Sequence, residues 1–221
     1  MSALQVLEKD HLISLIEAGE PIEISFPVFN RSIQDAIHLV VDEILRKYGK
    51  DELKECVYTT LKELVCNGIK ANLKHAVFND YRIDPSDEAS LRKGLDILKK
   101  IIAENDPDEI EKKARENGLY VTLNIIHPQH RIIVIVENNS VLTELEERRI
   151  REKFGKAMKY DSIADFYMDN LDDSEGQGIG ITMIVLMLKG NNISPHSFTI
   201  DMKSKDITRA KIEFPIDGTK E

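Results

Sequence analysis

The long helical run from Asp51 to about Phe78 constrains this chain more than any other stretch, because it contains no proline and a single glycine. At 3.6 residues per turn, four polar side chains of this run fall within an arc of about 60°. They are Glu63, Asn67, Lys70 and Lys74. Apolar side chains occupy most of the opposite side. The run therefore predicts a helix with one face in the core and one face that carries a carboxylate, an amide and two ammonium groups.

This polar column has two interpretations. A solvated face with ion pairs one turn apart accounts for most such patterns. Asn67 is unusual at the centre of the column, because asparagine is a mediocre helix former and adds no charge pairing. Its amide oxygen suits a hydrated Mg²⁺ ion, Glu63 could orient or deprotonate a water molecule, and Lys70 could hold a phosphate group.

A glycine-rich segment near the C-terminus points to anion binding. Gly176, Gly178 and Gly180 alternate just before an apolar run that Gly190 ends. Alternating glycines let the backbone approach an anion closely, and the start of the following helix offers unpaired N–H groups and a positive dipole end. The spacing differs from the dinucleotide-binding fingerprint, and no Lys-Ser or Lys-Thr pair follows as a Walker loop requires.

Together the two stretches resemble the N box and the G2 box of the GHKL family of ATP-binding proteins, which includes histidine kinases, DNA gyrase, MutL-type repair proteins and the large heat-shock chaperones. The resemblance covers roughly residues 50–78 and 119–215. It implies an α+β fold, a Bergerat-type two-layer sandwich with helices on one face of a mixed, mostly antiparallel sheet. It also implies binding of ATP with Mg²⁺. The N-box matches are Glu63, Asn67, Lys70 and Ala71, and the G2-box matches are Gly176, Gly178 and Gly180.

The resemblance also implies a role for each matched residue. Asn67 would be a ligand of Mg²⁺, Lys70 would neutralise phosphate charge, and Glu63 would position or activate the attacking group as the catalytic residue. The backbone of the glycine-rich segment would cradle the phosphates, and a threonine near the last strand would lie by the adenine. The further nucleotide contacts implied in this way are Ala71, Gly176, Gln177, Gly178, Ile179, Gly180 and Thr208.

The third family motif, the Asp-x-Gly-x-Gly of the G1 box, is not matched. The continuous apolar run 132–136 predicts a strand buried on both faces, and the box should follow it. The chain has Glu137 and Asn138 at this place instead. In the family the aspartate accepts a hydrogen bond from the adenine amino group, and either Glu137 or Asn138 has an oxygen that could accept it.

Hydrophobic periodicity and turn residues predict the remaining elements within a single domain, 1–221. Residues 1–50 are expected to form an N-terminal extension, and residues 79–117 an inserted helical pair that is either packing or a partner surface. The acidic stretch 160–175 is expected to be a loop, the lid over the nucleotide. The other expected helices are 3–18, 31–48 and 143–158, and the other expected strands are 22–28, 119–126, 197–202 and 208–215.

Charge, apolar runs and cysteine positions limit which kinds of partner and which cellular compartment the sequence predicts. The net charge of −9 argues against nucleic acid or an anionic membrane as a partner. The chain start has no signal-peptide pattern, and the longest apolar run, 179–188, is too short to span a bilayer. Cys56 and Cys66 are too far apart on one helix to form a disulfide, which fits a reducing cytoplasm.

These observations predict a cytoplasmic protein that binds an adenine nucleotide with Mg²⁺ and either hydrolyses ATP or transfers its phosphoryl group to a separate protein. None of the 6 histidines lies in the His-Glu-x-x-x-Pro pattern of a kinase phosphoacceptor. Two alternatives stay open, a nucleotide-sensing interaction module with little turnover and an anti-sigma-type serine kinase. A protein partner or phosphoacceptor is expected, and a homodimer is compatible with the sequence.

Overall fold

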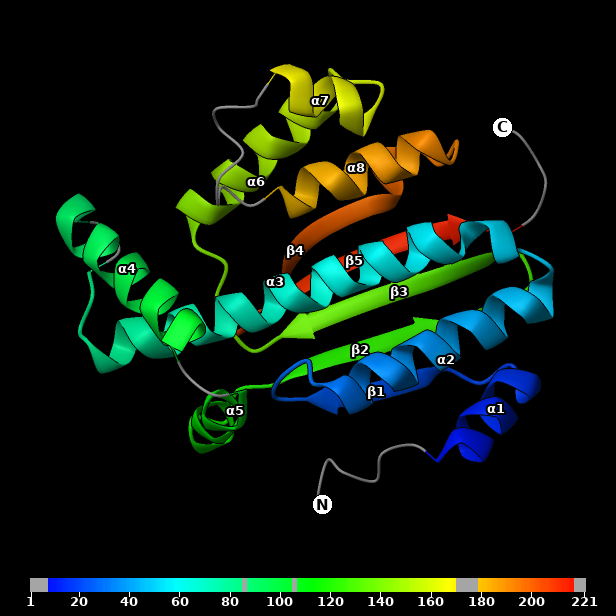
Figure 1. Cartoon of the computed structure of the whole chain (residues 1–221), viewed down its shortest axis with the longest axis horizontal. Coiled ribbons are helices and arrows are strands. Elements are labelled where there is room, and N and C mark those ends of the chain that lie inside the picture. Colours follow the sequence, from blue (N-terminus) through cyan, green and yellow to red (C-terminus); the bar gives the residue numbers. More distant parts are fainter. Residues whose placement is uncertain (1–7, 85–86, 105–106, 170–178, 217–221) are drawn as a thin grey trace.

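The computed structural model describes residues 8–84, 87–104, 107–169 and 179–216, which form an α+β two-layer sandwich (Figure 1). Its sheet has 5 strands in the order β1-β2-β3-β5-β4, and all four neighbouring pairs are antiparallel. The expected mixed sheet is therefore wrong in this detail. Short turns join β2 to β3 and β4 to β5, and such turns connect antiparallel neighbours. The strands are β1 Ile22–Phe26, β2 Val121–Ile126, β3 Arg131–Asn138, β4 Phe198–Ser204 and β5 Ile207–Pro215.

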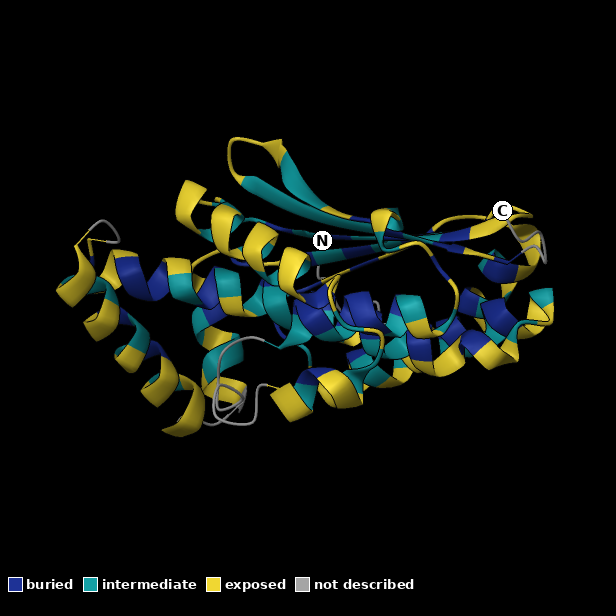
Figure 2. Cartoon of the chain, turned by 90° about the horizontal axis from the view of Figure 1, so that it is seen from above, coloured by how far each residue is buried: buried dark blue, intermediate teal, exposed yellow. Residues whose placement is uncertain are grey.

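The sheet has one buried face and one half-buried face (Figure 2). Strand β3 lies in the middle of the sheet, yet its side chains alternate between buried and half-buried positions. Val134 and Val136 point into the core, whereas Ile133 and Ile135 lie on the half-buried face beside strand neighbours such as Lys211. The prediction of a strand buried on both faces is therefore wrong, because the continuous apolar run does not report how each face is covered.

Three helices supply most of the core on the buried face. Helix α2, Arg31–Tyr48, begins where the Asn30 side chain accepts a hydrogen bond from the N–H of Ile33. Helix α3, Lys54–Asp80, follows a short 3₁₀ turn, Asp51–Leu53, and crosses the sheet against β3. Helix α8, Gly180–Gly190, packs beside α3.

The N-terminal segment belongs to the body of the domain. Strand β1 extends the sheet by pairing with β2, with Ile24 opposite Leu123. Helix α1, Lys9–Ala18, packs on α2, and both contribute to the main core. The described residues 8–50 are therefore part of the sandwich rather than an extension of it.

The predicted helical pair between α3 and β2 is confirmed as α4, Glu88–Glu104, and α5, Pro107–Glu116. These helices and the C-terminal half of α3 enclose a second, smaller core. Gly94 allows the close contact, since a Cβ at this position would lie 2.8 Å from atoms of both Ile83 and Phe78.

The chain between β3 and α8 is more helical than predicted. Helix α6, Glu144–Ala157, begins with a capping box between Thr143 and Glu146. The expected acidic loop contains helix α7, Ile163–Asp169. Its Phe166 is buried and packs edge-on against Tyr160, with the ring centroids 5.2 Å apart. Among the described helices, none has both the length and the apolar character to cross a membrane.

Candidate functional site

A cavity of about 300 Å³ lies between α3, the end of β3, strand β5 and helix α6. Its volume is at the lower end of the range for small-molecule sites. Four residues expected from the sequence to bind nucleotide line it. They are Asn67, Ala71, Asn138 and Thr208.

The polar column of α3 and the start of α8 meet beside this cavity. A Cβ on Gly180 would lie 2.5 Å from Oε2 of Glu63 and 3.5 Å from Nδ2 of Asn67. Only glycine leaves room for the Glu63 carboxylate where it stands. The structure thus brings Glu63, Asn67 and Gly180 together, although more than a hundred residues of sequence separate α8 from the N box.

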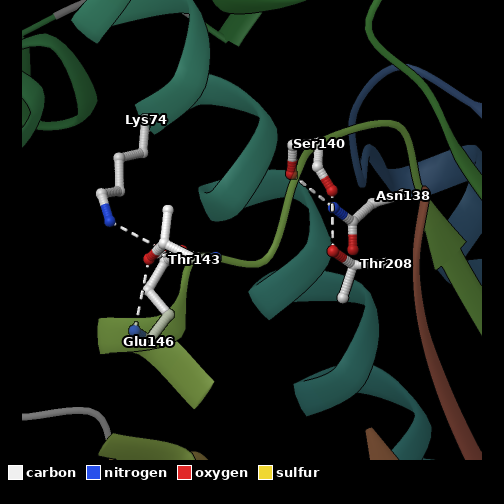
Figure 3. A network of polar contacts seen from close by, with 6 residues as sticks. All are labelled: Lys74, Asn138, Ser140, Thr143, Glu146 and Thr208. Carbon is white, nitrogen blue, oxygen red and sulfur yellow. Dashed lines mark hydrogen bonds and ion pairs between the residues drawn. The ribbon is translucent and has the colours of Figure 1, made fainter. Parts of the chain in front are cut away.

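The two lysines of the column have different surroundings. Lys70 is exposed and is not among the described residues that line the cavity, because it lies about 100° round the helix from Ala71. Lys74, one turn further on, lines the cavity, and its Nζ lies 2.5 Å from Oε1 of Glu146 (Figure 3). Of the two lysines of the column, Lys74 is therefore the one at the cavity wall, and the predicted phosphate contact of Lys70 has no support from the described geometry.

Strand alternation separates the two candidates at the G1 position. Asn138 is 6% exposed and lines the cavity. Glu137 points to the other face of the sheet, where its Oε2 lies 2.9 Å from Nζ of Lys203. Of the two oxygens that the sequence offers, only that of Asn138 faces the cavity.

Neighbouring acceptors orient the Asn138 amide (Figure 3). Its Nδ2 donates to Oγ of Ser140 at 2.6 Å and to Oδ1 of Asn72 at 3.3 Å. Thr208 lies opposite Asn138 in the β3–β5 register and donates its hydroxyl to the carbonyl of Ser140 at 2.7 Å. Among the described residues, no donor reaches Oδ1 of Asn138, which leaves it as a hydrogen-bond acceptor for a ligand.

Sequence reasoning missed Asn72, which holds this end of the site together. The residue is 2% exposed, and its Nδ2 donates to the carbonyl of Tyr120 at 2.8 Å and to Oδ1 of Asn139 at 3.1 Å. These bonds tie α3 to the start of β2 and the end of β3. The available signal was an amide on the apolar side of the N-box helix, because buried polar groups almost always have hydrogen-bond partners.

Helix α6 gives one wall of the cavity a cationic character. Burial lowers the pKa of the Lys153 ammonium, and the charge of Arg149 lowers it further. Burial raises the pKa of the Glu146 carboxyl, but hydrogen bonds from Lys74 and from Thr143 outweigh it, so the pKa lies below its usual value. A wall with Lys74, Arg149 and Lys153 against the single carboxylate of Glu146 favours an anionic ligand.

The remaining predicted contacts are only partly described. Gly176, Gln177 and Gly178 lie outside the described residues, as does the end of the expected lid. Ile179 is half-buried just before α8. Within the described ranges, no three His, Cys, Asp or Glu side chains gather as a metal site, and the chemistry available for Mg²⁺ is the amide oxygen of Asn67 together with oxygens of a ligand.

Comparisons with known proteins give a partial match. No family model matches the chain, and no solved structure matches it. An uncharacterized protein of Treponema pallidum (strain Nichols) is 29% identical over 184 residues. The match covers 83% of this chain and 36% of that protein, so the chain spans well under half the length of this relative.

Proposed function

We propose that this protein binds an adenine nucleotide with Mg²⁺ in the cavity between α3 and the sheet. The observation that carries the proposal is the meeting of the N-box residues Glu63 and Asn67 with Gly180 at one end of a cavity whose other wall holds Asn138. Gly180 and the polar column of α3 are distant in the chain and lie side by side next to one cavity.

The acceptor in the cavity favours adenine over guanine. Oδ1 of Asn138 can accept a hydrogen bond from the exocyclic amino group of adenine, because the Nδ2 of the same amide is engaged by Ser140 and Asn72. A guanine placed in the same way would set its carbonyl oxygen against this acceptor. An unsatisfied buried polar group costs about 1–3 kcal/mol, which would give a clear preference.

The phosphates would then lie towards Asn67 and the start of α8. Asn67 would bind Mg²⁺ through its amide oxygen, and the N–H groups at the start of α8 would face phosphate oxygens. The bound ion would neutralise charge on the transferred phosphoryl group. Glu63 would orient the attacking hydroxyl or water molecule, so the chemistry is ATP hydrolysis or phosphoryl transfer to a separate protein.

Calorimetric titration with a non-hydrolysable ATP analogue, with and without Mg²⁺, tests the binding. We expect binding that depends on Mg²⁺, a loss of that dependence in Asn67→Ala, and no change in Lys62→Ala, an exposed position on the same helix. Wild-type protein that is folded but gives no heat and no shift in Tm at millimolar analogue would refute the proposal, since a ligand of the native state raises Tm.

Turnover separates the candidate activities. We expect Glu63→Gln to keep nucleotide affinity and to slow turnover by roughly 10²-fold or more, the usual contribution of a general base. Binding without any turnover in the wild type would favour the nucleotide-sensing module. Transfer to a co-purified protein would favour a protein kinase, including one of the anti-sigma type.

We also propose a cytoplasmic location. Cys56 is buried and Cys66 is half-buried, and both are free thiols. Burial raises the pKa of Cys56 to about 11, which makes it an inert core thiol. Unpaired, buried cysteines suit a reducing compartment.

A further inference from the structure

A second cavity, of about 580 Å³, lies beside the first one, between α3, α4 and α6. The two cavities share a wall that includes Lys74 and Glu146, whose side chains form an ion pair. Its volume is within the range for small-molecule sites. The nucleotide proposal makes no use of this cavity.

Apolar side chains line much of the second cavity. Phe78 and Ile83 are each 9% exposed and belong to the smaller core, and Leu91 of α4 lies beside them. Two further lining residues, Val141 and Leu145, are 43% and 39% exposed although they are large and apolar. A ligand that covers them would remove their apolar surface from water, which favours binding.

Besides Lys74 of α3, this cavity has two cationic lining residues on α6. Arg148 and Arg149 both line it, and within the described part of the chain neither arginine has an ion pair with a carboxylate. The next arginine of the helix, Arg151, is paired with Glu147. Two adjacent guanidinium groups that have no carboxylate partner among the described residues are notable in a chain of net charge −9.

The acidic groups of the cavity do not remove this cationic character. Glu146 is held by Lys74 at 2.5 Å and by the hydroxyl of Thr143 at 2.7 Å. Glu144, at the first turn of α6, is the other lining carboxylate. An anionic ligand group is therefore favoured at the Arg148 and Arg149 side, one turn further along the helix.

We propose that the second cavity binds a small amphipathic anion. The apolar body of the ligand lies against Phe78, Leu91 and Leu145, and its single carboxylate or sulfonate group lies against Arg148 and Arg149. The site adjoins the proposed nucleotide site, since the Lys74–Glu146 ion pair and Arg149 line both cavities, whereas Arg148 lines the second cavity alone.

Fluorescence titration with anilinonaphthalene sulfonate, an aromatic probe with one anionic group, tests the site in the full chain without nucleotide. The uncharged parent compound, phenylnaphthylamine, reports the apolar contribution alone. We expect the sulfonate to bind roughly tenfold more tightly than the uncharged compound, the gain expected for one charge-assisted hydrogen bond.

Three variants locate the probe. Arg148→Glu is expected to weaken sulfonate binding by roughly tenfold while it leaves the uncharged compound almost unaffected. Leu145→Asp is expected to weaken the binding of both compounds. Because Leu145 is partly exposed, the variant should still fold, which circular dichroism checks. Arg151→Glu is the matched control, because it makes the same charge change on the same helix outside the cavity.

Equal affinity for the two compounds would overturn the proposal. So would sulfonate binding that survives both Leu145→Asp and Arg148→Glu, or that Arg151→Glu weakens as much as Arg148→Glu does. No nucleotide is present in these titrations, so their failure is distinguishable from failure of the nucleotide proposal.

Discussion

At the scale of single residues, the site depends on two glycines that leave room for polar side chains of neighbouring elements. Gly68 faces Asn138, and a Cβ on Gly68 would lie 3.3 Å from the Cβ of Asn138. Gly180 faces Glu63 in the same way, since a Cβ on Gly180 would lie 2.5 Å from Oε2 of Glu63. Neither glycine has a positive φ angle, so close approach rather than backbone freedom explains both.

Gly180→Ala is therefore expected to separate stability from activity. The added methyl group would displace the Glu63 carboxylate, which sits at the end of a flexible side chain, so the fold should persist. Alanine is the better helix former by about 1 kcal/mol, so Tm should stay the same or rise. Nucleotide turnover should fall. A large drop in Tm in thermal unfolding, with turnover retained, would contradict this account.

The buried imidazole of His127 predicts a pH dependence of stability. The ring is 2% exposed, and Nδ1 lies 3.2 Å from the hydroxyl of Tyr48. Burial lowers the pKa of His127, and the charge of Lys47 lowers it further. The folded state therefore favours the neutral ring, whereas the unfolded chain takes up a proton near pH 6.5, the usual histidine value.

The contribution of His127 to stability is thus fully present above about pH 6.5 and is lost as the pH falls from there through the lowered pKa. Urea unfolding at a series of pH values measures it. His127→Gln should flatten this acid-side decline relative to the wild type. An unchanged decline in the variant would assign the effect to other groups.

At the scale of elements, α3 belongs to two cores. Its N-terminal half packs on the sheet and α8, and its C-terminal half packs against α4 and α5. The part of α3 between the two cores carries the cavity residues Asn67, Ala71 and Lys74. Movement of α4 and α5 relative to the sheet would therefore act on the site through α3 itself.

Gly94→Ala tests how tightly the inserted pair is packed. The added Cβ would lie 2.8 Å from Phe78 and Ile83, so we expect a loss of about 1–3 kcal/mol in the free energy of unfolding, typical of overpacking. Gly155→Ala is the matched control on α6, where nothing lies within 4 Å, and alanine there should stabilise the protein. Denaturant unfolding of both variants measures the contrast, and equal effects would contradict tight packing at Gly94.

At the scale of the whole molecule, the histidine of the first helix lies away from the candidate site. His11 is on α1, which Figure 1 shows at the opposite end of the sheet from the tip of β3, where Asn138 lies. His38 of α2 is exposed and stacks on Tyr58 with the ring centroids 3.5 Å apart. In-line phosphoryl transfer needs the acceptor within about 3–3.5 Å of the phosphorus atom.

We therefore expect the isolated protein not to phosphorylate itself on histidine, and any acceptor to be water or another protein. Incubation with γ-labelled ATP, followed by acid and base treatment, checks this. A label that is labile to acid, stable to base and mapped to His11 or His38 would show the opposite.

The sequence by itself determined the elements. The periodicity of α2 and α3 and the alternation in β1 are local properties, and these elements formed close to where they were predicted. The helical pair in 79–117 was predictable for the same reason. Helix α7 was not predicted, because the acidic residues around Phe166 indicate a solvated loop. Burial of Phe166 against the rest of the fold stabilises the helix, and the local sequence does not show this burial.

Only the tertiary structure decided which polar residues of these elements share a cavity. Glu137 and Asn138 are adjacent in sequence, so their side chains point to opposite faces of the sheet. The orientation of β3 in the sheet decides that Asn138 faces the cavity. Lys70 and Lys74 are one turn apart, and the rotation of α3 against the sheet leaves only the second at the cavity wall. Such choices depend on contacts between elements distant in the chain, and local periodicity carries no information about them.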